Sequence, residues 1–73
     1  MKYQDYKTEN EREQEVLEHI STFREIYGYS PSYKQLAMLM GISKSRIAQI
    51  VEALIIKKLV TKDGNKARTL QIV

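Results

Sequence analysis

The hydrophobic positions from residue 36 to residue 54 recur at the spacing of two short helices joined by a tight turn. Apolar side chains occur at positions 36, 37, 39 and 40 and again at 47, 50, 51 and 54, in each case the spacing of one helical face. Between them, Gly41 can take the positive φ that a turn needs without a steric penalty. Ser43 is placed to cap the second helix by accepting a backbone N–H. We therefore expect a helix-turn-helix, with helices at about 32–40 and 44–58.

The residues before this pair predict a longer amphipathic helix. Thr8 and Glu11 have the spacing of a capping box, which marks a helix N-terminus. We expect this helix to run from about 9 to 27, to end at Gly28 and to keep its acidic side in water. Pro31 makes the residues just before it extended, and a short strand is an option there. The apolar stripe of the helix consists of Val16, Leu17, Ile20, Phe23 and Tyr27.

The C-terminal residues favour a β-hairpin. Residues 59–62 are β-prone, residues 63–66 form a strong turn signal, and residues 68–73 alternate between polar and apolar side chains. The expected core-facing side chains of the hairpin are Leu59, Leu70 and Ile72. Three helices followed by such a hairpin make a winged helix-turn-helix, a mainly α fold with a small β part.

This domain is expected to cover residues 9–73. Residues 1–8 show no helical or strand periodicity and are expected to form a flexible N-terminal tail. The alternative is that Tyr3 and Tyr6 pack on the domain or on a second copy of it.

Composition narrows the classes of function. The 73 residues make one domain near the lower size limit, with no cysteine and one histidine, so neither a disulfide nor a metal cluster is expected. No apolar run approaches the ~20 residues of a membrane span, and we expect a cytoplasmic protein without membrane contact. Residues 1–32 hold four basic and seven acidic side chains, whereas residues 33–73 hold eight basic and two acidic ones. The basic half suggests a face for a polyanion, although an ordinary solvated surface would look the same.

The outward side of the predicted helix at 44–58 has the chemistry of a DNA recognition helix. Arginine pairs with guanine O6 and N7, and glutamine with adenine N6 and N7, in the major groove. We predict base contacts from Ser45, Arg46 and Gln49; the alternative is that these side chains are merely solvated. The predicted phosphate contacts are Ser32, Tyr33, Lys34, Lys44, Lys62, Lys66 and Arg68.

Two alternatives stand beside these phosphate contacts. In the first alternative, Tyr33 packs against the core instead of contacting the DNA backbone. In the second, the cations near the hairpin turn only keep the hairpin edge from pairing with other chains; these are Lys62, Lys66 and Arg68.

Several segments of the chain also resemble a known family. They are residues 12–17, 28–32, 36–37 with 41–42, 52–54 and 57–60. Through them, residues 10–73 are similar to the N-terminal DNA-binding domain of LexA repressors, a winged helix-turn-helix. The resemblance implies a small transcriptional regulator, in particular a repressor, of bacterial, phage or mobile-element origin. The segment Ser43–Arg46 departs from the family's pattern and is one residue shorter, and the resemblance brings no Ser–Lys catalytic pair to this sequence.

Two classes of function follow from these observations. The first is sequence-specific binding of double-stranded DNA, with a homodimer on two half-sites about 34 Å apart as the route to tight binding. The second is a winged-helix module that binds another protein without contacting DNA, because a fold does not fix a function. No paired carboxylates, Ser–His arrangement, metal-ligand spacing or glycine-rich phosphate loop occurs, so neither an enzyme nor a cofactor is expected. Binding of RNA or single strands is less favoured, since the outward helix side lacks aromatic residues.

Overall fold

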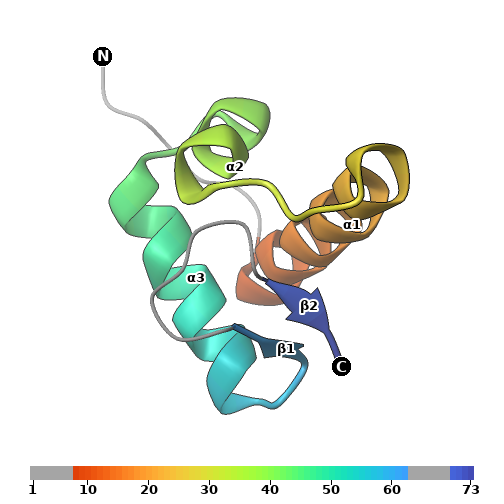
Figure 1. Cartoon of the computed structure of the whole chain (residues 1–73). Helices are drawn as coiled ribbons and strands as arrows, with labels where there is room; N and C mark the ends of the chain where they lie inside the picture. Colours follow the sequence, from red (N-terminus) through yellow and green to blue (C-terminus); the bar gives the residue numbers. More distant parts are fainter. Residues whose placement is uncertain (1–7, 63–69) are drawn as a thin grey trace.

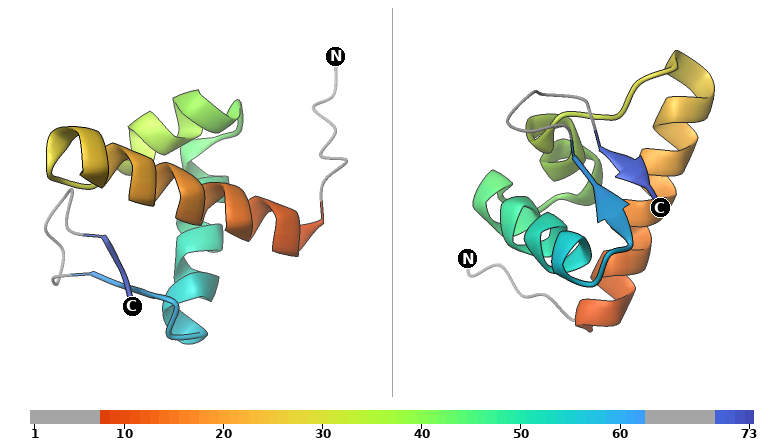
Figure 2. Two further views of the ribbon diagram at one scale, coloured as in Figure 1. Left: turned by 90° about the vertical axis from the view of Figure 1, so that its right-hand side faces the viewer. Right: turned by 60° about the horizontal axis from the view of Figure 1, so that its bottom comes forward.

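The computed structural model describes residues 8–62 and 70–73. Within these residues, three helices and a small antiparallel sheet make up the fold (Figure 1). Helix α1 lies across α2 and α3, and the two-stranded sheet packs against α1 and α3 (Figure 2). This arrangement confirms the predicted winged helix. The elements are α1 (Glu9–Tyr27), α2 (Tyr33–Met40), α3 (Lys44–Ile56), β1 (Val60–Thr61) and β2 (Gln71–Ile72).

The helix ends follow from the local sequence. Thr8 and Ser32 each form a complete capping box, with Glu11 and Gln35 as the respective third residues of α1 and α2. The Ser43 hydroxyl caps α3 by accepting the Arg46 N–H at 3.1 Å. These bonds satisfy N–H groups that the first turn of a helix would otherwise leave without partners. The C-terminal glycines of α1 and α2, Gly28 and Gly41, have φ of 82° and 68°, the left-handed conformation expected from the sequence.

One apolar core joins all the elements. Most of the predicted stripe of α1 contributes to it, but Tyr27 is 56% exposed, because it lies in the last turn of α1, where its ring packs on Phe23 and Tyr29. In α2, Leu39 is also exposed, contrary to the pattern predicted for that helix. The fully buried core residues are Val16, Ile20, Leu36, Ile42, Ile47, Ile50, Val51, Leu54, Val60 and Leu70.

The prediction that the acidic side of α1 lies in water is wrong for one glutamate. Glu13 is buried, and its two carboxylate oxygens accept from Lys57 Nζ at 2.9 and 3.0 Å. Arg12 beside it is buried as well. Arg12 forms an ion pair with Glu15 of the same helix at 3.2 Å, whereas the Glu13–Lys57 ion pair ties α1 to the C-terminal end of α3.

The small sheet pairs Val60 with Ile72 and Thr61 with Gln71. The prediction that Leu59 and Ile72 face the core is wrong, since they are 43% and 45% exposed, while Val60 and Leu70 are buried. Side chains alternate along a strand, so burying Val60 turns Leu59 away from the core. Ile72 is the last residue of β2 and lies at the end of this two-stranded sheet. The predicted turn at 63–66 lies outside the described residues.

The extended segment before Pro31 is attached to the sheet without being a strand. In the described chain the strands are β1 and β2 alone, so the suggested strand there is absent. The buried Ser30 hydroxyl instead accepts the Leu70 N–H at 3.1 Å. A side chain therefore makes the link that a third strand would have made through its backbone.

Candidate nucleic-acid interface

Helix α3 presents one side to solvent because its other side is in the core. Its apolar residues Ile47, Ile50 and Leu54 are fully buried. Ser45 and Gln49 lie one helical turn apart on the outward side, and both are exposed. The helix thus presents two of the three predicted base-contacting side chains to solvent, with Lys44 exposed in its first turn.

Arg46, the third predicted base contact, is not fully open to solvent. Its guanidinium Nη2 forms an ion pair and hydrogen bond with Glu9 Oε1, and its side chain is only 28% exposed. Glu9 is the first residue of α1 and lies 37 positions earlier in the chain. Glu9 was not among the residues predicted at this surface, because only the crossing of α1 and α3 brings it to Arg46.

The N-terminus of α2 contacts the wing, which is the part of the chain that contains β1 and β2, at Lys62, the residue directly after β1. Lys62 Nζ lies 3.3 Å from the Tyr33 hydroxyl and 5.1 Å from the centre of its ring, close enough for a cation–π contact. Tyr33 is half-buried and also packs against the core, so its side chain contacts both Lys62 and the core. Lys34 beside it is exposed, and the Ser32 hydroxyl caps α2 by accepting the Gln35 N–H at 3.1 Å. The helix start and the wing base are therefore in contact.

Two of the predicted phosphate contacts, Lys66 and Arg68, lie outside the described residues. The other five are Ser32, Tyr33, Lys34, Lys44 and Lys62, which come from the start of α2, the start of α3 and the end of β1. No single element supplies this set, so its use as a phosphate-binding surface depends on the packing of the helix-turn-helix against the wing.

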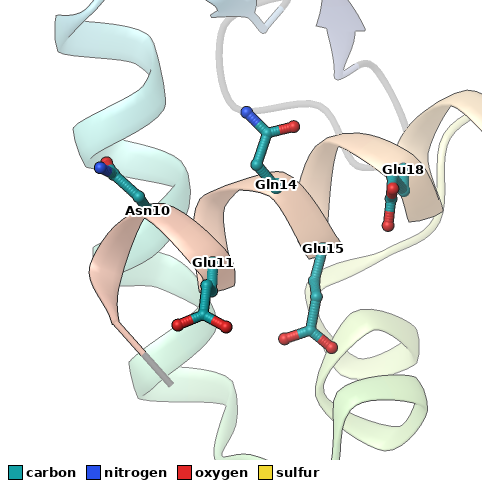
Figure 3. A pocket seen from close by; sticks show the side chains of 5 residues that line it. All are labelled: Asn10, Glu11, Gln14, Glu15 and Glu18. Carbon is teal, nitrogen blue, oxygen red and sulfur yellow. The ribbon is translucent and has the colours of Figure 1, made fainter.

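The exposed surface of α1 has the opposite charge. A shallow pocket of about 310 Å³ runs along it, and Glu11 and Glu15 project side by side there (Figure 3). Carboxylates repel the phosphates of DNA, so this surface is unsuited to a polyanion. The pocket is lined by Asn10, Glu11, Gln14, Glu15 and Glu18.

Residues 8–62 and 70–73 contain no cluster of three or more His, Cys, Asp or Glu side chains suited to a metal ion. Within the same residues, none of the helices combines the length and apolarity that a membrane crossing requires.

Comparison with known proteins identifies relatives over most of the chain. Residues 7–69 match the protein family described as the LexA DNA binding domain. A LexA repressor from Koribacter versatilis (strain Ellin345) is 30% identical over 63 residues. That stretch is 85% of this chain but 30% of the repressor, so the chain spans less than a third of the relative's length. These matches confirm the resemblance inferred from the sequence segments.

Proposed function

The chain belongs to the LexA DNA-binding domain family, and from this premise we propose that it binds specific sequences of double-stranded DNA and represses transcription. The family is one of DNA-binding domains, which supports DNA as the ligand of this chain. The observation that supports sequence specificity is the outward side of α3. Its exposed Ser45 and Gln49 are the kinds of side chain that bind base edges in the major groove.

In the proposed complex, the N-terminal half of α3 enters the major groove. Gln49 binds adenine, Arg46 binds guanine after leaving Glu9, and Ser45 contacts a base edge between them. Lys44 meets a phosphate at the groove wall. A recognition helix of this kind contacts bases mainly through its N-terminal residues, which is where these four side chains lie.

The remaining phosphate contacts hold this orientation. Lys34 and the N-terminus of α2 bind one phosphate, since a helix N-terminus attracts anions. Lys62, held against Tyr33, contacts the backbone beside the wing together with Lys66 and Arg68. These contacts add affinity for any sequence, and the affinity falls as the salt concentration rises.

A single domain of this size covers only part of a regulatory site. We propose that two copies bind half-sites about 34 Å apart, one helical turn of DNA, so that both recognition helices enter the same face of the duplex. The setting is the cytoplasm or nucleoid of a bacterium, and the origin is a bacterial, phage or mobile-element genome.

Alanine variants of two neighbouring cations test this assignment. Replacing Arg46 by alanine removes a bidentate guanine contact and should reduce discrimination at one base pair by about 1–3 kcal/mol. Replacing Lys44 by alanine removes a phosphate contact and should weaken binding to all sequences by a similar factor. Competition mobility shifts with duplexes selected from a random pool measure both effects. The proposal fails if the two variants have the same effect on every duplex.

A protein-interaction module remains the second candidate function. It is favoured by an exposed apolar cluster at the end of α1, where Phe23, Tyr27 and Tyr29 pack together beside the exposed Ile26. Exposed clusters of this kind often mark contacts with other proteins. Retention on heparin and on mixed DNA at low salt separates the two functions, because only the DNA-binding function predicts retention on both.

A further inference from the structure

Arg46 has a partner within the chain that DNA must displace. This partner is Glu9, in the first turn of α1. The Glu9 side chain is 61% exposed, whereas the Arg46 side chain is 28% exposed. Both ends of the contact are fixed in position. The capping box of Thr8 holds the start of α1, and the Arg46 N–H bonded to the Ser43 hydroxyl holds the start of α3.

The ion pair is weak enough to be broken by DNA. An exposed pair changes an equilibrium by at most about fivefold. A bidentate arginine–guanine contact discriminates against a wrong base by about 5- to 150-fold. Arg46 therefore leaves Glu9 for a correctly placed guanine, but returns to Glu9 when the facing base pair offers no suitable acceptor.

This competition changes how strictly one base pair is recognised. At the correct base pair, binding must first break the pair with Glu9, which lowers the affinity. At a wrong base pair, the pair with Glu9 stays intact, as it is in the free protein, so it leaves that affinity unchanged. The ratio between the two affinities therefore falls by the factor that the ion pair contributes, and only at the base pair that faces Arg46.

We propose that Glu9 is a specificity-determining residue, which makes the domain tolerant of substitutions at the base pair contacted by Arg46. The inference rests on the proposed binding of specific DNA. It assigns a role to an acidic residue on α1, outside the recognition helix, and it predicts that removing its charge makes the protein more selective.

The test compares Glu9→Gln with Glu18→Gln, which removes the same charge from another exposed position of α1. The probe is the duplex that the wild-type chain enriches from a random pool, together with all its single-base-pair variants. Arg46→Ala identifies the base pair that faces Arg46. Relative to Glu18→Gln, Glu9→Gln should bind the enriched duplex about two- to fivefold more tightly. The penalty for a wrong base should rise by the same factor at that base pair alone.

A double variant makes the test independent of general charge effects. In the Arg46→Ala background, Glu9→Gln should change binding no more than Glu18→Gln does. The inference is overturned if Glu9→Gln weakens binding to the enriched duplex, since Glu9 would then position Arg46 in the complex. It is also overturned if both charge variants strengthen binding to every duplex equally. A wild-type chain that enriches no duplex overturns the proposed function, and the inference with it.

Discussion

At the scale of single residues, Ser30 links two segments of the core that lie 40 positions apart in the sequence. Its buried hydroxyl accepts the Leu70 N–H, which leads into β2. In the described part of the chain, every buried side-chain polar atom has a hydrogen-bond partner. A polar side chain inside so small a core is stable only under that condition.

Replacing Ser30 by alanine should destabilise the domain by about 1–3 kcal/mol, because the Leu70 N–H loses its partner inside the protein. Urea unfolding followed by circular dichroism measures this loss. Ser21→Ala, at an exposed position of α1, is the control and should change stability by less than about 0.5 kcal/mol. Equal stabilities for the two variants would show that the Ser30–Leu70 bond is not structurally important.

Residues whose roles depend on local sequence were predicted well, and those that depend on distant partners were not. The caps at Thr8 and Ser43 follow from short-range spacing, and both are confirmed. The exposure of Gln49 follows from helical periodicity in the same way. The contact of Glu9 with Arg46 depends on how two helices cross, which no pattern within either helix specifies.

At the scale of elements, the end of α3 contains a strained residue. Lys58 has φ of 62°, the left-handed conformation that glycine usually occupies after a helix. Its N–H donates to the Ile55 carbonyl at 2.9 Å, and the Leu59 N–H donates to the Leu54 carbonyl at 3.0 Å. These bonds end α3 and turn the chain into β1. Lys58 is not a residue type that is typical of this conformation, so the turn was not predicted, and Leu59 was therefore assigned to the wrong side of the sheet.

Replacing Lys58 by glycine should stabilise the domain by about 0.5–1 kcal/mol, because glycine adopts a positive φ without steric cost. The matched control is Lys58→Ala, which removes the same charge but keeps the Cβ atom and hence the strain. Thermal unfolding of the three proteins at equal concentration measures the difference. A glycine variant no more stable than the alanine variant would mean that Lys58 is not strained.

At the scale of the whole molecule, the fold separates the two signs of charge between elements. Carboxylates of α1 line a shallow pocket, while Lys34 lies on α2, Lys44 lies on α3 and Lys62 directly follows β1. This separation was visible in the sequence as an acidic first half and a basic second half. Glu9 and Glu13 are exceptions, since they form ion pairs with Arg46 in α3 and with Lys57 at its C-cap.

The central claim is that the outward side of α3 enters the major groove, and methylation interference tests it most directly. Dimethyl sulfate methylates guanine N7 in the major groove and adenine N3 in the minor groove. On a duplex enriched by the wild-type chain, methylated guanine N7 should block binding within each half-site, and Arg46→Ala should abolish the block at one guanine. Interference confined to adenine N3, or none at all, would contradict the claim.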